Sequence, residues 1–164
     1  MPLQITETIA ANEKLSSERI DYDKYEAETM EKLLSRVKEC DLDNAKELIY
    51  HCINDSIIHI EICDIDNCFS DAAEIEYFEF NTVEEAEPLL SKRGPIKALL
   101  VVISAGKDDE LTMLEVQDCL IRIESASGQK LESDKLIWSQ IQKAPVGYLH
   151  MLVQFKVIQE PLQL

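Results

Sequence analysis

The chain has little glycine, and this shortage excludes one large class of binding loop. Its 164 residues include four glycines, and Gly94, Gly106, Gly128 and Gly147 lie far apart in the sequence. Phosphate-binding loops need clustered glycines, because only glycine lets backbone N–H groups approach a phosphate closely. The sequence contains no Walker A loop and no G-x-G-x-x-G turn, so we expect no nucleotide cofactor bound by this chain alone.

Positive charge is also scarce. Lysine and arginine number 16 against 32 acidic residues, which gives a net charge of −16 at pH 7. The imbalance is uneven, since residues 1–92 hold 23 acids and 8 bases whereas residues 93–164 hold 9 and 8. A surface this negative repels phosphate backbones and anionic lipids. We therefore predict neither nucleic acid nor membrane as a direct partner. The charge itself indicates either solubility or attraction to a basic partner or a cation. We expect a protein partner or self-association.

Long apolar runs and regular cysteine spacing are missing as well. No window approaches the roughly 20 apolar residues of a membrane-spanning helix, and no signal-peptide pattern follows Met1. The five cysteines are an odd number at irregular spacings, which indicates a reducing compartment. We expect a cytoplasmic protein. A cluster within residues 51–68 contains no C-x-x-C or H-x-x-x-H pair, so we expect no metal site from His51, Cys52, His59, Cys63 and Cys68.

What the sequence does contain is a marked strand and helix in residues 97–123. Leu99 to Ile103 is an aliphatic run typical of a strand buried on both faces. Thr112 and Glu115 have the spacing of a helix-capping box. One helical face then follows, made of Val116, Cys119, Leu120 and Ile123. The pattern predicts a helix lying on a sheet.

Further elements complete the order β-α-β-α-β-β. Strands are predicted in residues 74–80, 135–141 and 148–157, and a second capping box at Thr82 starts a helix that ends near Leu90. We predict an α+β fold in which a mixed four-stranded sheet has its helices packed on one face. The last strand alternates cleanly, which places His150, Gln154 and Lys156 together on its polar face. We expect His150 on the surface. If this strand lies at a sheet edge, it could recruit another strand.

The first third of the chain has a helical pattern and no predicted strand of the β-α-β-α-β-β unit. Residues 1–19 lack periodicity and are predicted to be a flexible arm, and residues 158–164 a short tail. Residues 20–56 predict a helical extension of two helices, the second with apolar residues at helical spacing over 45–53. The main domain is then predicted to span residues 57–157. Within it, Ile58, Ile60 and Ile62 alternate with polar residues, which on periodicity alone indicates a strand.

Three motifs resemble the C-terminal domain of the tubulin/FtsZ family, and FtsZ more than tubulin. They are Leu111-Thr112-Met113-Leu114-Glu115-Val116 after a core strand, Leu136-Ile137-Trp138, and residues 57–65. The turn before the first motif is about two residues longer than in the family, at Asp108 to Glu110. The resemblance covers roughly residues 45–157. It implies the β-α-β-α-β-β sheet already predicted, and for residues 57–63 it favours a loop that runs into a short helix.

The resemblance also implies a candidate site. In FtsZ an acidic loop completes the GTPase site of the neighbouring subunit, and Glu61 and Asp64 match its two acidic positions. Glu61 departs from the family's aspartate, and His59 replaces a usual asparagine. The resemblance therefore implies an acidic loop of His59, Glu61 and Asp64 that acts in trans, whereas the family's GTP-binding domain has no counterpart in this sequence.

These observations lead to one expectation and leave two alternatives open. We expect a non-catalytic interaction or assembly module without a cofactor, acting on or in a tubulin-like cell-division or cytoskeletal filament. One alternative is a small enzyme or ligand-binding domain on the same sheet, since a fold does not fix a function. The other is a fragment of a full GTPase. An acidic chain also admits a simpler interpretation, in which Glu61 and Asp64 are solvated surface residues.

Overall fold

The computed structural model describes residues 22–104, 112–141 and 148–156. The predicted arm 1–19, the acidic turn at 108–110 and the tail 158–164 lie outside the described residues. The helical elements are a helix whose described part covers 22–34, a short 3-10 turn η1 (Glu39–Asp41), α2 (Leu42–Asn54), α3 (Ile62–Cys68), α4 (Val83–Arg93) and α5 (Met113–Ser127). The strands are β1 (Glu76–Phe80), β2 (Ile96–Ser104), β3 (Leu136–Ile141) and β4 (Leu149–Phe155).

The strands form one mixed sheet in the order β1-β4-β2-β3. Strands β2 and β3 are parallel, while β4 pairs antiparallel with both β1 and β2. The predicted α+β fold with a mixed four-stranded sheet is confirmed. Strand β4 lies inside the sheet, between β1 and β2, so it does not offer the open edge that was considered from the sequence.

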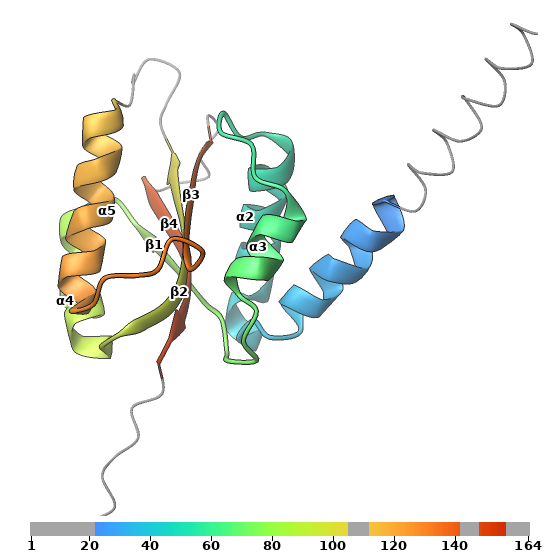
Figure 1. Cartoon of the computed structure of the whole chain (residues 1–164), viewed down its shortest axis with the longest axis horizontal. Coiled ribbons are helices and arrows are strands. Elements are labelled where there is room, and N and C mark those ends of the chain that lie inside the picture. Colours follow the sequence, from blue (N-terminus) through green and yellow to red (C-terminus); the bar gives the residue numbers. More distant parts are fainter. Residues whose placement is uncertain (1–21, 105–111, 142–147, 157–164) are drawn as a thin grey trace, which may run out of the picture.

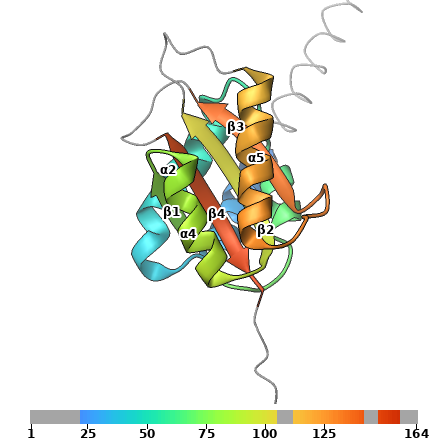
Figure 2. The ribbon, with the colours of Figure 1, turned by 90° about the vertical axis from the view of Figure 1, so that its left-hand side faces the viewer.

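Helices cover both faces of this sheet (Figure 1). Helices α4 and α5, which belong to the β-α-β-α-β-β unit, pack together on one face, as predicted, and Figure 2 looks onto that face. The other face is covered by α2 and α3, with the helix at 22–34 beside them. The N-terminal helices therefore turn a two-layer unit into a three-layer one.

The central strand β2 explains why both faces must be covered. Leu99, Val101 and Ile103 contact the α4 and α5 layer, whereas the alternate side chains contact the α2 and α3 layer, and all are fully buried. A fully buried aliphatic side chain contributes about 1.5–3 kcal/mol relative to exposure. A strand with apolar side chains on both faces is stable only between two layers.

The second layer corrects one sequence-based prediction. His150 lies on the predicted face of β4, but it is 1% exposed, not on the surface. Its Nδ1 lies 2.8 Å from the hydroxyl oxygen of Tyr77. Gln154 on the same face is also buried, and its Nε2 donates to the carbonyl oxygens of Asp71 at 3.0 Å and Ala73 at 2.8 Å. The polar face of β4 is thus internal. The Gln154 amide nitrogen and the His150 ring have partners there, whereas Oε1 of Gln154 is buried without a hydrogen-bond partner.

Local sequence signals set the helix boundaries. The Thr112 hydroxyl accepts from the Glu115 N–H at 3.2 Å, and the Glu115 carboxylate accepts from the Thr112 N–H at 3.2 Å, which confirms the capping box of α5. Helix α5 ends before Gly128, whose φ of 78° is a conformation that glycine adopts without strain. No helix in the described part of the chain is long and apolar enough to cross a membrane.

Candidate functional site

Residues 57–61 are a loop, and α3 begins directly after it at Ile62. The loop-then-helix form implied by the family resemblance is therefore correct, and the strand indicated by periodicity is wrong. Ile60 and Ile62 are buried, whereas His59 and Glu61 are exposed. The alternation arises because isoleucines on either side of the helix start both turn into the core.

The loop is fastened to the end of strand β3. The N–H of Ile57 donates to the carbonyl oxygen of Gln140 at 2.8 Å, and the Ser139 hydroxyl donates to the carbonyl oxygen of Ile58 at 2.7 Å. Ser56 forms an isolated antiparallel bridge with Ile141. Three consecutive residues, 56–58, are thus held against the last residues of one strand. The backbone of the loop is fixed before any partner arrives.

The two predicted acidic residues have different local roles. The Asp64 carboxylate accepts from the Glu61 N–H at 3.0 Å and so caps the start of α3. The Glu61 carboxylate lies 3.5 Å from the Cys63 thiol, and the pKa of Cys63 is raised by desolvation and by this hydrogen bond. All three candidate residues are exposed: His59 and Glu61 in the loop, and Asp64 in the first turn of α3. Glu61 and His59 remain open to a partner, while Asp64 also serves the helix.

The structure adds residues to this surface that the sequence did not single out. Ile57 is 52% exposed and Ile58 is 36% exposed. Tyr22, from the helix at 22–34, is 47% exposed, and its pKa is raised by desolvation and then by the carboxylates of Glu26 and Glu61. Periodicity alone grouped Ile58 with Ile60 and Ile62, which are buried, so the exposure of Ile58 could not be anticipated.

The histidines and cysteines considered as metal ligands are dispersed. Cys52 and Cys68 are buried in the core, and burial raises the pKa of their thiols to about 12 and about 11. His51 lies 3.0 Å from the carboxylate of Asp55 on the surface of α2. Among the described residues, no group of three or more His, Cys, Asp or Glu side chains is arranged to hold a metal ion.

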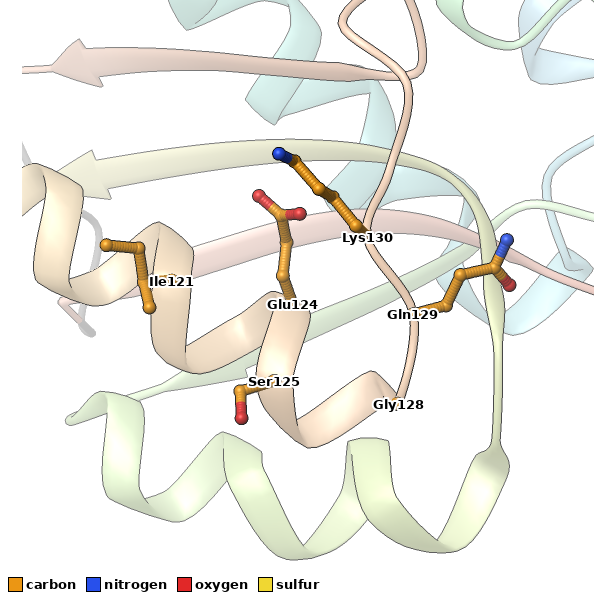
Figure 3. Close-up of a pocket in the computed structure, with 6 residues that line it drawn as sticks. All are labelled: Ile121, Glu124, Ser125, Gly128, Gln129 and Lys130. Carbon is orange, nitrogen blue, oxygen red and sulfur yellow. The ribbon is translucent and has the colours of Figure 1, made fainter.

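Several open depressions mark the surface, and Figure 3 shows one of about 510 Å³ at the end of α5. Glu124 and Lys130 reach to one side of the α5–β3 loop, and Gln129 reaches to the other. The Glu124 carboxylate accepts from the Leu131 N–H at 3.2 Å, which holds the loop against the helix. The polar groups here stabilise the chain reversal. The depression is lined by Ile121, Glu124, Ser125, Gly128, Gln129 and Lys130.

A second depression, of about 380 Å³, lies between α4 and α5 and includes the Tyr148 ring. Arg122 on its wall pairs with the carboxylates of Glu84, at 2.7 Å, and Glu87. The hydrogen bond from Arg122 lowers the pKa of Glu84. These ion pairs join the two helices of one layer, so we assign them a structural role.

Comparisons with known proteins give a limited result. No protein-family model matches the chain, and no curated protein matches it. Among solved structures it is similar to a W319Y mutant of FtsZ from M. jannaschii, at 15% identity and a TM-score of 0.47, over 73% of this chain and 39% of that one. It is also similar to an empty FtsZ dimer of the same organism, at 15% identity and a TM-score of 0.40, over 71% and 39%. The chain thus spans 39% of the length of these FtsZ chains.

Proposed function

We propose that this chain is a non-catalytic protein-interaction or assembly module, and that residues 57–64 are its contact surface. One observation carries the proposal. A loop with a fixed backbone presents two neighbouring isoleucines, Ile57 and Ile58, and the polar side chains of His59 and Glu61 to solvent. Apolar side chains bordered by polar ones on a rigid segment are the usual composition of a protein contact.

Energetics supports a contact at this loop. Burying a whole isoleucine side chain contributes about 1.5–3 kcal/mol, so covering the exposed half of Ile57 alone would contribute about 1 kcal/mol. Because the loop is already hydrogen-bonded to β3, a partner would not have to order its backbone, which lowers the entropic cost of association. The surface therefore suits a protein partner better than a small ligand.

The position of the loop on the sheet agrees with this role. Ser104 and Ile141 are paired at the carboxyl ends of the parallel strands β2 and β3, and Ser56 bridges to Ile141 at the same end. Functional loops of open α/β sheets gather at the carboxyl ends of parallel strands. The loop thus lies at an end of the sheet where a partner could contact it without displacing either helical layer.

The kind of partner follows from the motif resemblance described above. We propose a subunit of a tubulin-like filament, as in cell division or the cytoskeleton, with Glu61 and Asp64 directed at its nucleotide site or imitating that contact. The module itself would not bind GTP. Titration calorimetry with GTP and Mg²⁺ should show no submicromolar binding, and such binding would overturn this part of the proposal.

Purified FtsZ assembling in GTP provides the test. We expect the chain to change both polymer mass, measured by sedimentation, and GTP turnover. The double variant Glu61→Gln/Asp64→Asn should lose this effect. Asparagine at 64 keeps an oxygen that can accept from the Glu61 N–H, so the variant removes two charges while retaining the cap of α3.

A matched control separates the loop from general charge. Asp118→Asn/Glu39→Gln removes two exposed carboxylates elsewhere on the described surface and should act as the unmodified chain does. If the unmodified chain changes neither polymer mass nor turnover, filament docking is wrong. If both double variants lose activity equally, long-range charge acts and the loop is not the contact.

A further inference from the structure

We infer that a lysine-lined pocket at the end of β3 opposite the 57–64 loop binds a small, multiply charged oxyanion carrying phosphate groups. The pocket lies where the starts of β2 and β3 meet the α5–β3 loop and the residue after β4. Since β3 has six residues at about 3.3 Å each, this pocket lies roughly 20 Å from the loop. It is lined by Ile96, Lys97, Gln129, Lys130, Leu131, Glu132, Lys135 and Lys156.

The concentration of positive charge there is unusual for this chain. Residues 93–164 contain six lysines, and Lys107 and Lys143 lie outside the described residues. The other four lysines all line this one pocket. In a chain of net charge −16, solubility gives no reason to gather lysines in one place. A pocket that collects them suits an anionic ligand.

The ammonium groups keep donors available for a ligand. Lys97 pairs with the Asp71 carboxylate at 3.3 Å. Lys135 donates to neutral oxygens only, the Ser70 hydroxyl at 2.9 Å and the Cys68 carbonyl at 3.4 Å. Lys130, Lys135 and Lys156 form no ion pair with any carboxylate in the described part of the chain. Each ammonium has three donors, so most of them remain for an anion.

Gln129 contributes a neutral donor to the same pocket. Its side chain turns away from Glu124 and Lys130, as Figure 3 shows, and its Oε1 accepts from the Lys156 ammonium at 2.7 Å. Because lysine can only donate, this contact fixes the amide orientation and leaves the Gln129 NH₂ group as a donor. Charge-assisted hydrogen bonds from ammonium groups, supported by an amide, are a recurrent means of holding phosphate oxygens.

Size limits the ligand. The pocket measures about 200 Å³, below the 300–1,000 Å³ that drug-sized ligands occupy. It suits a phosphate or pyrophosphate group, and a whole nucleotide would protrude from it. The acidic half of the chain does not prevent binding, because charges beyond the Debye length of about 8 Å at physiological ionic strength are largely screened.

Two probes distinguish the sources of such a group. Inorganic pyrophosphate represents a free anion, and O-phosphoserine represents a phosphorylated side chain. Titration calorimetry on the full chain should show submillimolar binding of at least one of them, and the tighter probe identifies the source. Affinity should fall as the ionic strength is raised. Absence of binding by both probes at low ionic strength would overturn the inference.

Three single variants, each changing the net charge by one unit, localise the site. Lys156→Gln should weaken binding about fivefold or more, the effect of one charge pair at contact distance in water. Glu132→Gln removes the carboxylate from the lining and should tighten binding severalfold. Lys92→Gln, at an exposed position on α4, should leave affinity unchanged. Equal weakening by Lys156→Gln and Lys92→Gln would show general charge attraction and refute the site. None of these results depends on the filament proposal.

Discussion

Replacing Arg36 with alanine should destabilise the protein by far more than removing the neighbouring lysine that approaches the same carboxylate. The Arg36 guanidinium is 13% exposed and donates to the Phe69 carbonyl oxygen at the end of α3 and to the Asp71 carbonyl oxygen at 2.9 Å. Its Nη2 also lies 3.6 Å from the Asp66 carboxylate. Arg36 thus fixes the end of α3 to the turn after the helix at 22–34.

The magnitude follows from these contacts. Hydrogen bonds to charged groups contribute about 1.5–3 kcal/mol each. Two of them would give more than 3 kcal/mol, but Nε and Nη2 of Arg36 are buried without a hydrogen-bond partner, which offsets part of the gain. We expect Arg36→Ala to cost about 2–3 kcal/mol. For a chain of this length that corresponds to a fall in Tm of about 4–12 °C.

Lys32 provides the matched control. Its ammonium lies 3.8 Å from the same Asp66 oxygen, but its side chain is 69% exposed. Exposed ion pairs contribute about 0–1 kcal/mol, so Lys32→Ala should cost at most about 1 kcal/mol. Urea unfolding followed by circular dichroism measures both variants. Equal losses, or a loss below about 1 kcal/mol for Arg36→Ala, would refute the assigned role of the buried guanidinium.

Three further outcomes are expected. Thr112→Ala should cost about 1 kcal/mol because α5 loses its cap, whereas Thr112→Ser should retain most of the stability, as thermal melting would show. The pKa of Glu84 is lowered because its ionised carboxylate pairs with Arg122. This pair therefore stabilises the fold fully at pH values above the ordinary pKa of a glutamate, and the contribution is lost as pH falls through the lowered pKa. Arg122→Gln should raise the pKa of Glu84 toward its ordinary value in a carbon-13 NMR titration, and an unchanged titration would contradict the ion pair. A thiol reagent at pH 8 should modify the exposed Cys40 first. Burial raises the pKa values of Cys52, Cys68 and Cys119 to about 12, 11 and 11, so these thiols should react slowly. Rapid modification of these three thiols in the folded protein would contradict their packing.

Strand β4 shows how far sequence periodicity reaches. Alternation assigned Leu149, Met151 and Val153 to one face and His150 and Gln154 to the other, and the structure has the same two faces. Periodicity reports which side chains share a face but not what covers that face. The burial of His150 and Gln154 depends on helices that come from the first third of the chain. The sequence of β4 itself does not indicate that these helices cover its polar face.

Residues 57–63 show the opposite limit. The apolar side chains recur every second residue, but the loop carries Ile60 inward and the first turn of α3 carries Ile62 inward. Two isoleucines with this spacing do not distinguish a strand from a junction. The acidic pair Glu61 and Asp64 did contain the correct signal, since its i, i+3 spacing allows the Asp64 carboxylate to accept from the Glu61 N–H at a helix start.

Coverage of both sheet faces restricts where this chain can meet other molecules. One face of the sheet is covered by α4 and α5, and the other by α2 and α3 (Figure 1). The ends of the strands are not covered by these layers, and loops and strand starts reach solvent there. At one end the 57–64 segment lies beside the last residues of β3. At the other end the described lysines of residues 93–164 lie beside its first residues. The two ends differ in charge and in the size of group they can hold. The proposed protein contact and the proposed oxyanion pocket therefore lie at opposite ends of β3, and neither proposal involves a catalytic group of the sheet.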